Sequence, residues 1–337
     1  MPLLLDTARS PSTVDLRGRN CLTVGLVNNM PDAACEATER QFRDLLRAAS
    51  GNVIVRLKLY AIADVPRAEA VRQELGARYR DIADLSDTPL DGLIVTGTEP
   101  CAANLQDEPY WPALSRLVDW ARDNTASTVW SCLAAHAAVL HADGIARQPL
   151  ETKLSGVFDC AAVTDHPLLA DVAPRLHVPH SRLNDLPEPA LRSRGYRVLS
   201  RSATAGVDAF VKEDEDSSLF LFFQGHPEYD ADSLLREYRR DVGRFLRGER
   251  AAYPEPPQDY FNSAAMFLAN DFRMRAVGER RGDLVGDFPM EPLAAAIENT
   301  WRNPAVGLYR NWINYLKARK RDRKSLAIVE AARRVSA

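Results

Sequence analysis

The sequence predicts an α/β fold: a mostly parallel sheet with helices on both faces, followed by a helical C-terminal extension. Three observations support this. Short apolar, β-branched runs alternate with helical stretches over about the first 140 residues. Several of these runs end at Asn, Gly or Cys, as strands do where they enter loops. A chain of 337 residues that is 46% hydrophobic also has enough apolar side chains for a large core.

The first elements follow the pattern of a βαβ unit. We expect a polar, flexible arm over residues 1–19 and then a buried strand at Cys21–Val27. The segment Ala33–Ala49 carries apolar residues at helical spacing and is followed by Gly51, which predicts a helix that ends there. Alternating apolar residues over Val53–Tyr60 then predict a second strand.

The same alternation continues as far as a cysteine. We expect a helix at Arg67–Leu85, a buried strand at Asp91–Thr96 and a helix at Tyr110–Asn124. A fourth strand then enters a sharp turn at Cys132, and the alanine-rich run Ala134–His141 continues as a helix. Strands that alternate with helices in this way pair in parallel, with the helices on both faces.

The rest of the chain divides into a mixed extension of the sheet and a helical end. Five further strands are expected, at 153–163, 176–179, 196–200, 209–212 and 219–224. Three later helices are expected, at 231–247, 266–281 and 293–320. We therefore predict three units: the arm (1–19), an α/β catalytic domain (20–250) and a mainly helical extension (251–337). We expect the extension to dock on the catalytic domain or on a partner subunit of a homodimer.

Composition narrows the class of protein. The net charge of −3 gives no electrostatic reason to bind nucleic acid, and the basic cluster Lys317–Lys324 is typical of a solvated helix face. No apolar run is long enough for a membrane span, and no signal peptide is recognised, so we expect a cytoplasmic protein without a membrane partner. Five widely spaced cysteines without a CxxC pair argue against disulfides, and the histidines show no ligand spacing, so no metal is expected.

Cys132 is the first candidate for chemistry. Between a strand and a helix its side chain is presented outward, and the helix N-terminus favours a thiolate. The alternative is a buried structural cysteine, because free cysteines are often buried. A second apolar strand, Leu219–Gln224, delivers His226 and Glu228 at its carboxyl end, and ligands bind at that end of the strands in such sheets. Together the three residues form a nucleophile, a base and a carboxylate that orients the base.

Several short motifs resemble one known family. They are LIVTG at 93–97, YW at 110–111, the cysteine turn, KLSGVF at 153–158, PHSR at 179–182, GHPEYD at 225–230 and NWINY at 311–315. In this order they resemble the homoserine O-acyltransferases of methionine biosynthesis, the trans-succinylases and trans-acetylases, over about Cys21 to Tyr315. That family shares a fold related to class I glutamine amidotransferases, and the resemblance therefore implies this fold here.

The resemblance also implies roles for individual residues. Cys132 would take an acyl group from acyl-CoA, a co-substrate, with His226 as general base and Glu228 as its orienting group. Lys153, Ser181 and Arg240 would be the substrate-binding residues. The backbone N–H groups of Leu133 and of the Gly97–Thr98 turn would stabilise the oxyanion, as the turn geometry itself indicates.

The resemblance also indicates the acyl donor, through the residue at one position. Cys101 aligns where succinyl-using members tend to have glycine and acetyl-using members glutamate. Because Cys101 is small and largely neutral, we expect succinyl-CoA rather than acetyl-CoA, with homoserine as acceptor and no bound cofactor. Glu99 and Glu108 lie in the same loop as Cys101 and could intrude on the donor. The sequence also departs from the family at two other positions. Leu133 replaces a large residue that is common after the cysteine, and Asp32 follows Met-Pro where well-known members carry lysines.

Two other functions stay open at this stage. One is a glutamine amidotransferase or glutaminase that uses the same triad, although Ala134 and His136 stand where such enzymes place glycine and glutamine around the cysteine. The other is a catalytically silent binding protein of this fold.

Overall fold

The computed structural model describes residues 3–10, 20–87, 89–213 and 217–335. Its strands are β1 (Leu3–Asp6), β2 (Cys21–Val27), β3 (Ile54–Ala61), β4 (Arg80–Asp81), β5 (Gly92–Val95), β6 (Ser127–Ser131), β7 (Gln148–Ala162), β8 (Arg175–Asp185), β9 (Arg197–Ser202), β10 (Gly206–Lys212) and β11 (Leu219–Phe223). Its α-helices are α1 (Asp32–Ala49), α2 (Glu69–Arg78), α3 (Trp111–Asn124), α4 (Leu133–Asp143), α5 (Glu188–Ser193), α6 (Ser233–Leu246), α7 (Ser263–Glu279), α8 (Met290–Ala295) and α9 (Arg302–Val335).

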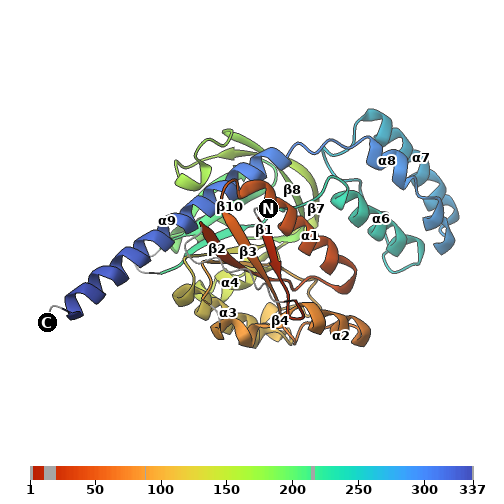
Figure 1. Cartoon of the computed structure of the whole chain (residues 1–337). Coiled ribbons are helices and arrows are strands. Elements are labelled where there is room, and N and C mark those ends of the chain that lie inside the picture. The colour runs from red at the N-terminus through yellow and green to blue at the C-terminus, as the bar shows by residue number, and fades with distance from the viewer. Residues whose placement is uncertain (1–2, 11–19, 88, 214–216, 336–337) are drawn as a thin grey trace.

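One mixed sheet organises the molecule (Figure 1). Its strands follow the order β1-β3-β2-β5-β6-β11-β10-β9-β7-β8, and β4 pairs with β3. The pairs from β1 to β11 are parallel, whereas those from β11 to β8 are antiparallel. The predicted α/β fold with a mostly parallel first half and a mixed extension is therefore confirmed.

Helices cover both faces of the parallel half. Side chains of α3 and α4 form one buried cluster with one face of the central strands, and side chains of α1 and α9 form a second cluster with the opposite face. The central strands β5, β6 and β11 are buried on both faces, which explains why β5 and β11 read as continuous apolar runs. No helix in the described part of the chain is long and apolar enough to cross a membrane.

The prediction of an irregular arm is wrong for the first residues of the chain. Leu3–Asp6 form the edge strand β1, which pairs in parallel with β3. Leu3 is buried against the core, and the Asp6 carboxylate lies 2.7 Å from the Arg80 guanidinium, so a buried side chain and an ion pair hold this strand in place. Residues 11–19 lie outside the described residues.

Other elements differ from the prediction in length. The helix expected over residues 67–85 ends at Arg78, and the short strand β4 and a 3₁₀ helix follow it. The short strands expected near residues 153 and 176 are instead the long antiparallel pair β7 and β8. Their alternation of exposed and buried residues hid their length, because it breaks up the apolar run.

The C-terminal helix α9 docks on the sheet of its own chain. Trp312 is fully buried and donates from Nε1 to Ser127 Oγ at 2.9 Å, while Tyr309 stacks on Phe223. Further along the helix, Lys320 Nζ lies 2.7 Å from an Asp91 carboxylate oxygen.

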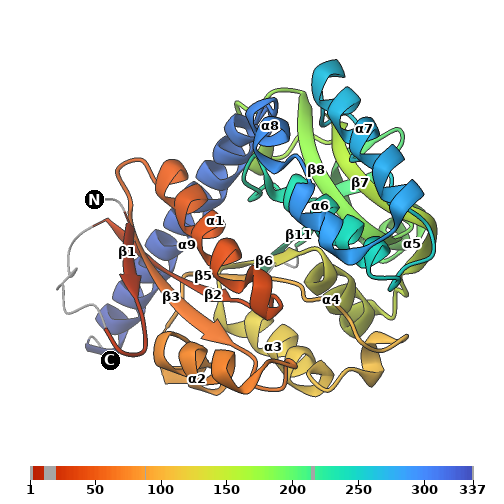
Figure 2. The same cartoon turned by 90° about the vertical axis from the view of Figure 1, so that its right-hand side faces the viewer.

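Helices α6, α7 and α8 form a separate cluster beside β7 and β8 (Figure 2). They share a buried core to which the ring of Trp301, just before α9, also belongs. The unit boundary expected at residue 250 falls between α6 and α7, inside this cluster, and stays a prediction.

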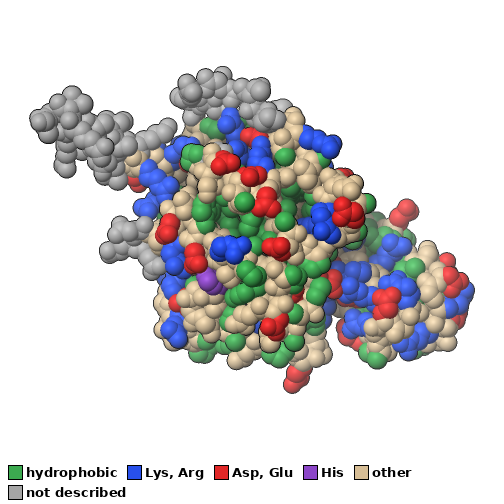
Figure 3. All heavy atoms as spheres, turned by 90° about the horizontal axis from the view of Figure 1, so that it is seen from below, with side chains coloured by type: hydrophobic (Ala, Val, Ile, Leu, Met, Phe, Trp, Pro, Cys, Tyr) green, Lys and Arg blue, Asp and Glu red, His purple; other side chains and the backbone are tan. Residues whose placement is uncertain are grey.

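The face of the molecule that lies at the bottom of Figure 1 carries charges of both signs. Figure 3 shows Lys and Arg side chains interspersed with Asp and Glu side chains over the surface seen there. Such intermixing is typical of an ordinary solvated surface.

Candidate active site

Cys132 occupies a strained turn between β6 and α4. Its backbone has φ 52° and ψ −114°, a conformation that L-residues rarely adopt outside functional turns. The Cys132 N–H donates to Phe223 O at 2.7 Å, which ties the turn to the neighbouring strand β11. The residue is partly exposed, so the structure favours an accessible thiol over the buried structural cysteine.

The predicted oxyanion residues converge on this turn. A methyl group added to Gly97 would lie 2.8 Å from Leu133 Cβ and 2.9 Å from Leu133 N, so the loop after β5 contacts the start of α4 directly. Leu133 is the first residue of α4, where backbone N–H groups have no partner within the helix. A negative oxygen bound beside Cys132 would therefore lie near these donors.

His226 connects Cys132 with Glu228. Its Nδ1 lies 2.8 Å from Glu228 Oε1, and the charge of Cys132 acts on the same ring. Both His226 and Glu228 are buried, so water does not compete strongly for these bonds. The three residues predicted from two strand ends thus form one connected set.

The electrostatics of this set favour a charged pair. Burial alone would lower the pKa of His226, but the charges of Cys132 and Glu228 and their hydrogen bonds outweigh it, so that the pKa is raised well above its ordinary value. A protonated imidazole stabilises a neighbouring thiolate, which is the nucleophilic form of cysteine.

The turn before His226 packs against a second histidine. A methyl group on Gly225 would lie 2.6 Å from Val178 Cγ1, 2.7 Å from Asp208 Oδ1 and 2.9 Å from His180 Nε2. The His226 N–H donates to Pro179 O at 2.7 Å. The backbone that carries His226 therefore fits tightly against β8, and only glycine leaves enough room at position 225.

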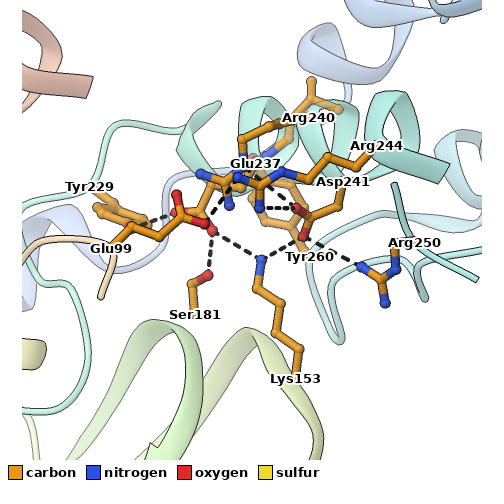
Figure 4. A network of polar contacts seen from close by, with 11 residues as sticks. Glu99, Lys153, Ser181, Tyr229, Glu237, Arg240, Asp241, Arg244, Arg250 and Tyr260 are labelled. Atoms are coloured by element: carbon orange, nitrogen blue, oxygen red, sulfur yellow. Dashed lines mark hydrogen bonds and ion pairs between the residues drawn. The ribbon is translucent and has the colours of Figure 1, made fainter. Parts of the chain in front are cut away.

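The predicted substrate-binding residues meet around two carboxylates of α6 (Figure 4). Lys153 Nζ lies 2.8 Å from Asp241 Oδ2 and 3.4 Å from Glu237 Oε2. Ser181 Oγ donates to Glu237, and Arg240 Nε lies 3.4 Å from Asp241 Oδ1. The structure thus brings Lys153, Ser181 and Arg240 into one polar network, although Arg240 itself is exposed.

The two carboxylates were not foreseen from the sequence. Glu237 and Asp241 are four residues apart on one face of α6, so they point to the same side. Burial opposes ionisation of Glu237, but Lys153 and the hydrogen bonds from Ser181 and Tyr229 outweigh it and lower its pKa. The available signal was the position of both acids within three residues of Arg240, seven and eleven residues after the end of GHPEYD.

The loop after β5, which carries Cys101 and is expected to set the acyl donor, contacts both the start of α4 and helix α6. Cys101 is exposed in it. Glu99 Oε1 lies 3.0 Å from Arg244 Nη2 of α6 (Figure 4), and Glu108 Oε1 accepts from the Ala102 N–H at 2.7 Å. Both carboxylates that flank Cys101 in sequence are therefore engaged by other groups.

A second cluster of Cys, His and Asp lies in the antiparallel half of the sheet. Ligand atoms of Cys160, His180 and Asp208 lie within 4.8 Å of one another, and all three residues are buried. Burial raises the pKa of the Cys160 thiol and lowers that of His180, while His180 Nε2 lies 3.4 Å from Asp208 Oδ1. The cluster is therefore a buried His–Asp pair beside a core cysteine.

Comparison with known proteins identifies the family. The family model described as homoserine O-succinyltransferase matches residues 10–323 of this chain. The chain belongs to this family. The resemblance predicted from the motifs is confirmed, and every motif that carried it lies within the matched range.

Relatives within the family are similar over nearly their whole length. The homoserine O-succinyltransferase of Rhodopseudomonas palustris is 53% identical over 292 residues, 87% of each chain. That of Bradyrhizobium japonicum is 49% identical over 315 residues, which cover 92% of this chain and 95% of the relative. Among solved structures, a glutamine amido transferase from Methylobacillus flagellatus matches 88% of this chain and 95% of its own, with a TM-score of 0.51 and 15% identity. At that identity the match shows the fold alone, and it confirms the predicted glutamine amidotransferase-like fold.

Proposed function

We propose that this chain is a homoserine O-succinyltransferase that works by a ping-pong mechanism through a thioester on Cys132. The observation that carries the proposal is Cys132 at a strained strand–helix turn, with its charge acting on His226, which is hydrogen-bonded to Glu228. Membership of the homoserine O-succinyltransferase family supports the choice of reaction.

In the first half-reaction the Cys132 thiolate attacks the thioester carbonyl of succinyl-CoA. The carbonyl oxygen becomes negative, and the N–H groups of Leu133 and of the Gly97–Thr98 turn stabilise it. The bond to the CoA sulfur then breaks, His226 supplies the proton that the leaving thiolate takes up, and succinyl-Cys132 and CoA remain.

In the second half-reaction neutral His226 removes the proton from the homoserine hydroxyl. The alkoxide attacks the succinyl-Cys132 thioester, and the Cys132 sulfur leaves as a thiolate stabilised by the newly protonated His226. Lys153, Ser181 and Arg240 lie together with two carboxylates in a charged network. This network suits an acceptor that carries both an ammonium and a carboxylate.

Succinyl-CoA is the proposed donor, and acetyl-CoA is the less favoured one. Cys101 neither crowds nor repels the distal carboxylate of a succinyl group. The relatives are named homoserine O-succinyltransferases, which supports the same choice. The place in methionine biosynthesis is proposed from that activity, whereas the homodimer and the cytoplasmic location stay predictions.

Intact-mass spectrometry with each donor and without acceptor tests this function. We expect succinyl-CoA to add one succinyl group to the wild-type protein and to Cys21→Ala, and to add none to Cys132→Ala. Homoserine should then remove the group and yield O-succinylhomoserine. No mass increase with either donor would contradict the thioester mechanism, and glutaminase activity in the absence of acyl transfer would establish the alternative reaction instead.

A further inference from the structure

The hydrogen bond of the His226 ring to Glu228 leaves one rotation open. Glu228 Oε1 lies 2.8 Å from Nδ1. This contact holds one nitrogen, but it does not fix the tilt of the ring plane. A base whose plane is tilted points its nitrogen away from the hydroxyl that it must deprotonate.

The ring of Tyr229 supplies the missing constraint. It lies parallel to the His226 ring, with 4.2 Å between the centroids and 16° between the planes. Tyr229 is itself buried, so its ring fills the space into which the imidazole would tilt.

Tyr229 is held at three separate points. Its N–H donates to His226 O at 3.2 Å, and its carbonyl oxygen accepts from Trp301 Nε1 at 2.8 Å. Its hydroxyl donates to Glu237 Oε1 at 2.6 Å (Figure 4). Contacts with the backbone, with the segment before α9 and with α6 therefore fix the position of this ring before any substrate binds.

We propose that Tyr229 is a positioning residue that sets the plane of the His226 ring and favours its protonated form through the stacked aromatic face. The proposal rests on the proposed function, in which His226 is the base. An aromatic face attracts a cation, so loss of the ring selectively destabilises the imidazolium.

The hydroxyl of Tyr229 adds a link to the substrate network. The carboxylate of Glu237 that accepts it also accepts from Ser181 and lies near Lys153. One carboxylate therefore anchors both the ring that positions the base and the residues proposed to hold the acceptor. This arrangement keeps the base and the acceptor hydroxyl in a fixed relation.

The test compares Tyr229→Leu, which removes the aromatic face, with Tyr229→Phe, which keeps the face and loses only the anchor. Tyr253→Leu serves as the matched control, because Tyr253 is a buried tyrosine that packs on Tyr238 and Phe245, in the same helical cluster. The His226 imidazole is titrated by NMR after the thiols are blocked with methyl methanethiosulfonate, with His226→Gln used to assign the signal. The same variants are assayed for kcat/KM with homoserine as a function of pH.

We expect the titration midpoint of His226 to fall by about half to one pH unit in Tyr229→Leu and to move by less than about 0.3 unit in Tyr229→Phe. The ascending limb of kcat/KM for homoserine should move to lower pH by the same amount, and its plateau should fall about tenfold or more in Tyr229→Leu.

A midpoint in Tyr229→Leu that equals that in Tyr253→Leu would overturn the proposal, because a general loss of stability moves no single titration. The NMR titration does not depend on acyl transfer. A shifted midpoint in Tyr229→Leu, together with a wild-type protein that forms no thioester, would therefore refute the proposed function and leave only the effect of Tyr229 on the His226 ring.

Discussion

Replacing Glu228 by glutamine tests how much of the catalytic set depends on one charge. The substitution keeps the shape of the side chain but removes the negative charge that lies 2.8 Å from His226 Nδ1 in a buried site. A carboxylate at this distance typically stabilises a protonated partner by about 1–3 pKa units, which is roughly 1.4–4 kcal/mol. Glu228→Gln should therefore lower the pKa of His226 and weaken the imidazolium charge beside the attacking sulfur.

The expected loss follows from that range. Thioester formation should slow by about 10- to 1000-fold at neutral pH, because each 1.4 kcal/mol changes the rate about tenfold. The amide group of glutamine also offers a donor to Nδ1, which favours the wrong tautomer of His226 and adds to the loss. The affinity for homoserine should change little, since Glu228 lies behind the ring and outside the network of Lys153 and Ser181.

Quenched-flow mass spectrometry of the thioester measures this step directly, under single-turnover conditions and over a range of pH. Thermal unfolding of the same variant checks that the fold is retained. A rate within about threefold of wild type, with an unchanged pH profile, would refute the idea that the charge of Glu228 supports the base.

Three further predictions concern the packing around the site. Gly225→Ala should destabilise the protein by about 1–3 kcal/mol in urea unfolding and lower the rate of thioester formation, because its methyl group would lie within 3 Å of Val178, Asp208 and His180. Glu237→Gln should lower stability at neutral pH. Since the folded-state pKa of Glu237 is lowered, its stabilisation is present above the unfolded-state pKa and is lost as the pH falls through the folded-state pKa, so unfolding curves of variant and wild type should converge in acid. Trp312→Phe should cost about 0.5–1.5 kcal/mol in urea unfolding for the lost bond to a serine of β6, and more if a cavity remains.

The parallel half of the fold was predictable because burial on both faces leaves a local signature. β5 and β11 are buried throughout and read as unbroken apolar runs, and β2 is mostly buried and mostly apolar. The edge strand β1 gives a weaker signal, since it is four residues long and only partly buried. Its place depends on a contact with Arg80, more than seventy residues away, which no local pattern records.

Part of the candidate site could likewise be predicted from the sequence, and part could not. Cys132, His226 and Glu228 each end or follow a strand, so their convergence follows from the geometry of the sheet. Glu237 and Asp241 lie on a helix rich in charged residues, where the usual expectation is a solvated face. The packing of α6 beside β7 and β8 turns that face toward Lys153 and Ser181. This packing is tertiary structure, which the local sequence of α6 does not indicate.

The helical cluster thus contributes to the site as well as to the fold. The nucleophile and the base lie on the sheet, whose strands hold them through backbone bonds such as that from Cys132 to Phe223. Glu237 lies on α6, and Trp301, which holds the backbone of Tyr229, belongs to the core of the same cluster. A change in the packing of that cluster would move the acceptor network relative to the base. Substitutions in the buried core of α7 are for this reason expected to lower the rate of transfer from succinyl-Cys132 to homoserine, which single-turnover assays of the second half-reaction would measure.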